Sequence, residues 1–173
     1  MKYLKQFSAT LSTILILFPF ILVVSYFFIR NVDLVELAVM WLVPGFLFTL
    51  IIGLTKKKNE TPINEFMIFI VAASVLYIGV FFLSAYLYVF GVFTIPSVGA
   101  YFLMKLMQRT ISPDLNKKLF LYSWFSAPIS GGIVLFFYLQ FGEFPLISVL
   151  PIMVWCFYMA VIIDLATRKE NNV

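Results

Sequence analysis

The residues that could carry chemistry in this chain are few, and most of them stand at the edges of long apolar stretches. The sequence has no His and a single Cys, Cys156, which lies inside an apolar stretch. Among the carboxylates, Asp164 lies deepest, four residues before Arg168. An ionisable group inside a membrane is costly and commonly functional. Asp164 is therefore a candidate for a proton or cation step, and the alternative is an interfacial i,i+4 ion pair with Arg168.

Catalytic sequence patterns give no support for an enzyme. A membrane hydrolase needs a nucleophile with a base within reach, and a proton-coupled transporter commonly needs a buried carboxylate or His. The sequence contains no HExxH, no Gly-x-Ser-x-Gly, no pair of Asp residues in the middle of apolar stretches and no phosphate-binding Gly loop. Its single Cys allows no intrachain disulfide. We therefore expect no catalytic residue, no metal site and no cofactor.

A second candidate site is built from residues that interrupt helices. Two apolar stretches carry a Pro and a Gly near their middle, and each Pro frees a backbone carbonyl. Inside a membrane such a carbonyl is tolerated only against protein or a watered cavity. The expected lining of a solute site, with Tyr77 and Trp41 as aromatic walls, is Pro44, Gly45, Ser126, Pro128, Ser130 and Gly131. The alternative is a kinked helix with a stripe of small residues, packed tightly in a bundle.

The elements that must position these residues are predicted to be membrane-spanning helices. The chain is 63% hydrophobic and 12% charged, against roughly a quarter charged in globular proteins. Apolar runs of about 20 residues, enough to cross a hydrocarbon core of ~30 Å, recur along its length. The pattern predicts an all-α integral membrane protein, a single domain in which six transmembrane helices joined by short loops cover residues 7–29, 34–54, 64–89, 93–109, 119–141 and 145–164.

Two of these helices share one apolar tract, residues 66–104. As a single helix the tract would be about 58 Å long, nearly twice the thickness of the hydrocarbon core. We therefore expect it to fold back within residues 90–96, where Gly91 and Pro96 provide the turn signal. Ser112 followed by Pro113 is expected to cap the start of the next helix.

The basic residues orient the six predicted helices. Eleven of the twelve Lys and Arg residues fall in alternate gaps between the apolar stretches, and only Arg30 falls in an opposite gap. The positive-inside rule then places both termini in the cytoplasm. Anionic lipid headgroups at these gaps account for the net charge of +4. The expected partner is therefore the lipid bilayer, and we expect no nucleic acid.

These features favour a non-catalytic accessory or regulatory membrane protein that acts through a partner, either another membrane protein or a second copy. The alternative is a solute-binding component of a transporter, with its site near the kinked second and fifth helices. In length and span count the chain is similar to the substrate-binding subunits of energy-coupling-factor vitamin importers. Those subunits dock through an Ala-rich first helix, whereas residues 7–29 are bulky, and the chain is not assigned to that family. Its Lys, Asn, Ile and Phe bias favours a bacterial inner (cytoplasmic) membrane.

Overall fold

The computed structural model describes residues 8–28, 34–56, 61–141 and 150–167, and this part of the chain is all-α. It contains six helices of 16 to 24 residues. They are α2 (Ser8–Phe28), α3 (Leu34–Lys56), α4 (Ile63–Tyr86), α5 (Tyr88–Thr110), α7 (Ser126–Phe141) and α8 (Leu150–Ala166). The short helices η1 (Lys117–Leu119) and α6 (Phe120–Ser123) precede α7. The prediction of an all-α protein with six helices is confirmed.

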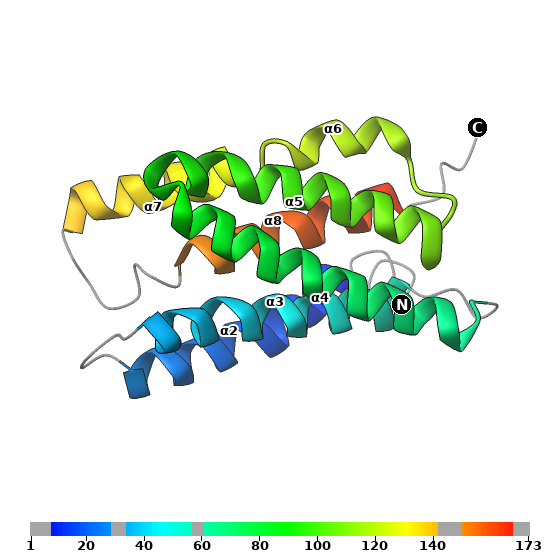
Figure 1. Cartoon of the computed structure of the whole chain (residues 1–173), viewed down its shortest axis with the longest axis horizontal. Coiled ribbons are helices and arrows are strands. Elements are labelled where there is room, and N and C mark those ends of the chain that lie inside the picture. The colour runs from blue at the N-terminus through cyan, green and yellow to red at the C-terminus, as the bar shows by residue number, and fades with distance from the viewer. Residues whose placement is uncertain (1–7, 29–33, 57–60, 142–149, 168–173) are drawn as a thin grey trace.

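The six helices lie side by side along the long axis of the molecule (Figure 1). Each helix contacts the next along the chain, from α2 through α3, α4, α5 and α7 to α8, and α8 contacts α2 in turn. The helices therefore form a closed ring. In addition, α8 contacts α3 across the ring, which makes the last helix the most central of the set.

One end of the bundle collects the basic residues of the described chain. Lys56 of α3 forms an ion pair with Asp164 of α8, and the Asp164 carboxylate also accepts from the Thr10 N–H near the start of α2. The Asn116 N–H donates to the Ala166 carbonyl at the end of α8 (2.9 Å). The basic residues at this end, or within two turns of it, are Lys56, Lys105, Arg109, Lys117 and Lys118.

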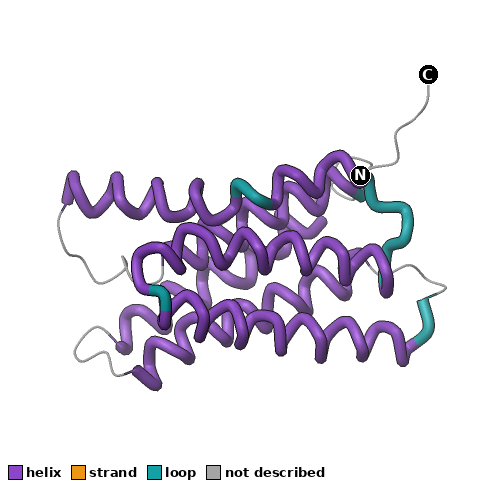
Figure 2. The backbone as a smooth tube through the Cα atoms, turned by 45° about the horizontal axis from the view of Figure 1, so that its top comes forward, coloured by secondary structure: helices purple, strands orange, loops and turns teal. Residues whose placement is uncertain are grey.

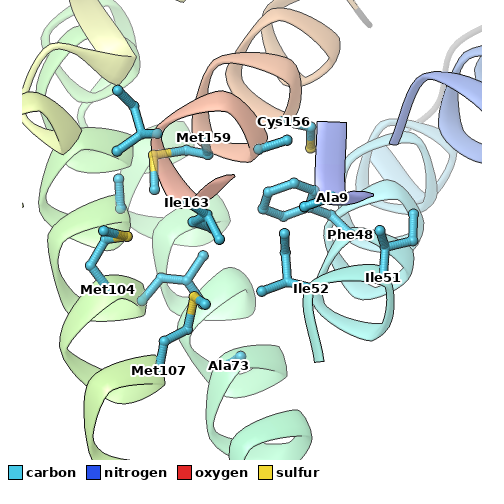
Figure 3. Packing of buried hydrophobic residues seen from close by; sticks show 14 of the residues in the cluster. Ala9, Phe48, Ile51, Ile52, Ala73, Met104, Met107, Cys156, Met159 and Ile163 are labelled. Atoms are coloured by element: carbon cyan, nitrogen blue, oxygen red, sulfur yellow. The ribbon is translucent and has the colours of Figure 1, made fainter. Parts of the chain in front are cut away.

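The core lies where α3, α4, α5 and α8 meet. Phe48 and Phe69 are its largest fully buried side chains. Figure 3 shows side chains of three of these helices meeting in the centre, among them Phe48, Met104, Met107, Met159 and Ile163. Thioether chains fill irregular gaps between helices well because they have three rotatable bonds.

The reversal between α4 and α5 is earlier than predicted. The single residue between the two helices is Leu87, and residues 90–96 lie inside α5, so the expected turn there is wrong. Gly91 serves a different purpose: a Cβ at this position would lie 2.5 Å from the Ser84 carbonyl oxygen. The missing side chain lets α5 leave the turn against the backbone of α4.

The helix expected at residues 119–141 is interrupted. The chain follows η1 and α6 and then restarts as α7, and Figure 2 shows the break as a short loop between two helical segments. Asn116, not Ser112, provides the N-cap: its side-chain oxygen accepts from the Lys118 N–H (3.0 Å). The chain between Ser112 and Asn116 remains non-helical, so the Ser112–Pro113 cap was wrong.

Two stretches of the described chain are long and apolar enough to cross a membrane. They are Ile63–Ser84, with a mean hydropathy of 2.7, and Lys117–Gln140, with a mean hydropathy of 1.5. Shorter apolar helical stretches are Ser8–Leu17, Leu42–Lys56 and Leu150–Ala166.

Candidate functional site

Asp164 is a buried carboxylate at the end of the bundle where the basic residues lie. Its side chain is on α8, in the last turn of that helix, and the residue is 1% exposed. The carboxylate accepts hydrogen bonds from the N–H groups of Ala9 (3.2 Å) and Thr10 (2.8 Å) and from the Thr10 hydroxyl (2.6 Å). It also forms an ion pair with Lys56 of α3. One carboxylate therefore joins α2, α3 and α8.

The electrostatics of helix ends explain this arrangement. The first N–H groups of a helix have no partner within it, and the helix dipole places partial positive charge there. Asp164 occupies that position for α2, although it comes from a different helix. Lys56 lies in the last turn of α3, where the dipole favours a cation. Within the described residues, the four polar contacts of Asp164 are all with groups that stabilise its negative charge.

The sequence selected Asp164 but did not find its partners. It was expected either to act in a proton or cation step or to form an interfacial pair with Arg168, which lies outside the described residues. The structure places it in a buried ion pair with Lys56. The sequence feature that could have indicated this contact was Thr10, a hydroxyl residue in the first turn of α2 at the basic end of the bundle. Among the described residues, no three His, Cys, Asp or Glu side chains come together as a metal site.

The second expected site falls at an aromatic cluster between α3, α4 and α8. A Cβ at Gly45 would lie 2.9 Å from Cδ1 of Tyr77, so the ring of Tyr77 packs directly on the backbone of α3. Tyr77 meets Trp155 edge to face, with ring centroids 5.4 Å apart, and Phe48 meets Trp155 at 5.8 Å. The Trp155 indole N–H donates to the Pro96 carbonyl of α5 (3.3 Å). Gly45 thus contributes to close packing.

A small cavity adjoins this cluster. Its volume is about 30 Å³, and it is lined by Leu42, Tyr77, Val80, Phe81, Pro96, Ser130, Pro151, Ile152 and Trp155. A water molecule needs roughly 10–15 Å³ measured in this way, so the cavity has room for only one or two waters. Tyr77 and Ser130 are brought together here as expected. Pro44 is buried on α3, and the side chain of Trp41 lies outside the described residues.

The remaining predicted residues lie near the break between α6 and α7. Pro128 has no N–H to donate to the Trp124 carbonyl one turn earlier. The Ser97 hydroxyl of α5 donates to that carbonyl instead (2.6 Å) and accepts from the Ala127 N–H (3.2 Å). A neighbouring helix thus satisfies the backbone at the break.

The small residues around the break have different surroundings. Ser130 is buried, and its hydroxyl donates to the Ala127 carbonyl of its own helix (3.0 Å). Ser126 and Gly131 are also buried, whereas Pro128 is exposed. In the described structure the Ser126 hydroxyl has no hydrogen-bond partner.

A larger cavity was not foreseen. It lies between α2, α7 and α8, has a volume of about 410 Å³, and is lined by Thr13, Ile14, Leu17, Ile133, Leu150, Met153, Val154, Cys156 and Phe157. Thr13 lies three residues after Thr10, hence on a similar face of α2. The sequence feature that could have indicated this cavity was the pair of hydroxyl residues, Thr10 and Thr13, on one face of an apolar helix.

No protein-family model matches the chain, and neither a curated protein nor a solved structure matches it.

Proposed function

We propose that this chain is a six-span protein of a bacterial cytoplasmic membrane, with both termini in the cytoplasm, and that it acts as a non-catalytic accessory or regulatory subunit of a membrane partner. Two apolar helical stretches of membrane-spanning length support the location. The alternating positions of the basic residues support the orientation.

The observation that carries the non-catalytic role is the use made of Asp164. Its carboxylate already accepts three hydrogen bonds and one ion pair from α2 and α3. A carboxylate held in this way stabilises helix packing, and protonating it for a transport step would weaken the contacts that join three helices. These contacts support a structural role for the charge of Asp164.

The solute-binding alternative has less support from the geometry. The cavity shared by Tyr77 and Ser130 has about 30 Å³, whereas sites for small molecules commonly have 300–1,000 Å³. The freed carbonyl of Trp124 is occupied by Ser97. The break between α6 and α7 is therefore better explained by helix packing than by a solute site.

The outer half of α7 offers a surface for a partner. From Leu135 to Gln140 every residue is exposed, so this part of the helix has no single face turned to the bundle. Exposed apolar side chains also follow α4, among them Met67, Val71, Val75, Ile78 and Phe82. Large apolar surfaces of this kind fit lipid, a helix of another membrane protein or a second copy of the chain.

Topology is the first test. Single Cys residues introduced by Asn59→Cys and Gly142→Cys should react with a membrane-impermeant maleimide from opposite sides of sealed vesicles. The native Cys156 is buried and serves as the unreactive background. Reaction of both new residues from the same side would contradict the six-span topology.

The partner is tested by gentle extraction followed by native mass spectrometry. A stoichiometric protein partner, or a second copy, is the result expected for an accessory subunit. A co-purifying polar solute without any protein partner would favour the transport alternative instead.

A further inference from the structure

The larger cavity lies between α2, α7 and α8, and its walls are almost entirely apolar. Three of its lining residues, Ile14, Ile133 and Phe157, are partly exposed at the surface of the bundle. The cavity therefore opens sideways, through the wall of the bundle. In a membrane-embedded protein this opening faces lipid.

One lining side chain is polar and unpartnered. Thr13 is 3% exposed, and its hydroxyl has no hydrogen-bond partner in the described structure. Hydroxyl residues inside apolar helices commonly donate to the carbonyl four residues earlier. In this chain that bond is made by Thr49, Thr55, Ser74, Thr110 and Thr167. Among the described residues the buried hydroxyls of Ser84 and Ser126 also lack a partner, but of these three only Thr13 lines the cavity, where a ligand could accept its hydrogen bond.

The volume of the cavity distinguishes between two kinds of apolar occupant. A helix with a diameter of about 10 Å would need the whole 410 Å³ for only about one turn. A flexible hydrocarbon chain has a much smaller cross-section and can run along the groove from Thr13 toward Leu150. The space thus fits a chain-like ligand better than the helix of a partner protein.

We propose that this cavity binds one acyl chain of a membrane phospholipid, and that the ester carbonyl of that chain accepts a hydrogen bond from the Thr13 hydroxyl. Thr13 lies five residues after the start of α2, which is about 7.5 Å along the helix axis. Ester carbonyls lie at a similar depth, between the headgroups and the hydrocarbon core. The inference rests on the proposed membrane location.

The experiment uses the full-length protein in vesicles of phosphatidylglycerol and phosphatidylethanolamine, with a small fraction of phosphatidylglycerol that carries a diazirine in one acyl chain. After irradiation, labelled residues are mapped by mass spectrometry. We expect labelling of Ile14, Met153 and Phe157 to exceed that of the exposed residues Val75 and Phe82 on α4 by several-fold.

Two variants with matched controls test the site itself. Met153→Trp should fill the cavity and lower its labelling several-fold, whereas Leu83→Trp, on the exposed face of α4, should leave it unchanged. Thr13→Val removes only the hydroxyl and should reduce retained phospholipid about two- to tenfold in native mass spectrometry. Thr55→Val, whose hydroxyl bonds its own helix, should retain phospholipid as the native chain does.

The outcomes separate this inference from the proposed function. Equal labelling of the cavity walls and α4 would mean annular lipid only and would overturn the binding site, while the membrane location would stand. No labelling of α4 or of the cavity would overturn the membrane location itself. Unchanged phospholipid retention by Thr13→Val would overturn the hydrogen bond to the ester carbonyl.

Discussion

At the scale of single residues, Asp164 and Lys56 show what makes a buried ion pair stable. Removing a charged side chain from water costs several kcal/mol, and the attraction of one partner offsets this only with good geometry and further hydrogen bonds. Asp164 has these bonds because the N–H groups of Ala9 and Thr10 are directed at its oxygens. The pair and the start of α2 therefore depend on one another.

Removing one partner should cost far more than removing both. Lys56→Met leaves the carboxylate buried without its cation, and we expect a loss of about 3–5 kcal/mol in the free energy of unfolding. Adding Asp164→Asn to that variant should restore a large part of the loss, because no buried charge remains. Equilibrium unfolding in mixed micelles with rising SDS measures both values.

The control for this pair is Lys118→Met, at an exposed position of η1, with an expected change within about 0.5 kcal/mol. A double variant less stable than Lys56→Met alone would contradict the mutual compensation of the two charges.

The sequence could identify Asp164 as unusual, but it could not identify its partners. The rules for helix N-termini consider a capping residue just before the helix and one three residues later. Here the acceptor for the first turn of α2 comes from the last helix, 154 positions from Thr10. Such a contact depends on the closure of the bundle, which no local pattern contains.

At the scale of the elements, the break between α6 and α7 shows how a proline is accommodated between packed helices. Pro128 removes the donor for the Trp124 carbonyl, and Ser97 of α5 provides another. The same hydroxyl accepts from Ala127, so one small side chain serves both ends of the break. The break and the contact between α5 and α7 are parts of one arrangement.

The two residues should therefore be energetically coupled. Ser97→Ala leaves the Trp124 carbonyl and the Ala127 N–H without partners, and we expect a loss of about 1–3 kcal/mol in stability. In a Pro128→Ala background the new N–H can donate to the Trp124 carbonyl, so the same change should cost about 1 kcal/mol less. A double-mutant cycle by SDS unfolding measures the difference.

Ser74→Ala is the matched control, because the Ser74 hydroxyl donates to the Ile70 carbonyl of its own helix (2.7 Å). Its cost should be the same with Pro128 or Ala at position 128. An equal cost of Ser97→Ala in both backgrounds would contradict the coupling.

Helix positions could largely be predicted from apolar runs, whereas breaks and turns could not. The stretch expected at 34–54 corresponds to α3, Leu34–Lys56, because length and hydropathy define it. The reversal at Leu87 carries no turn signal, and the nearby Gly91 is used for close packing on Ser84. A Gly in a sequence marks either use, and only the packed neighbour distinguishes them.

At the scale of the whole molecule, the outer surface carries many large apolar side chains. Val75 near the middle of α4 is 63% exposed, and Leu15, Leu139 and Phe136 are exposed on α2 and α7. In water this surface would promote association, whereas in a bilayer it needs no cover. Asp164 and Ser97, which join helices through polar contacts, are by contrast both buried.

A charge on this surface should reveal the surrounding medium. Val75→Lys places an ammonium group near the centre of the longest apolar helix, and we expect insertion of α4 to become less favourable by about 2.5–3.5 kcal/mol. Ile63→Lys, at the first residue of α4 and 75% exposed, should change it by less than about 1 kcal/mol. Glycosylation-based insertion assays in microsomes measure both, and equal effects would contradict a membrane-centred α4.

The closed ring also limits when its first contacts can form during synthesis. The first helix and the last are neighbours, and the acceptor for the opening turn of α2 is carried by Asp164, close to the end of α8. While the ribosome is still making the middle of the chain, the Asp164 carboxylate does not yet exist. It therefore cannot accept from the N–H groups of Ala9 and Thr10 or pair with the ammonium group of Lys56. The contacts of Ala9, Thr10 and Lys56 with Asp164 can therefore form only after α8 has been made.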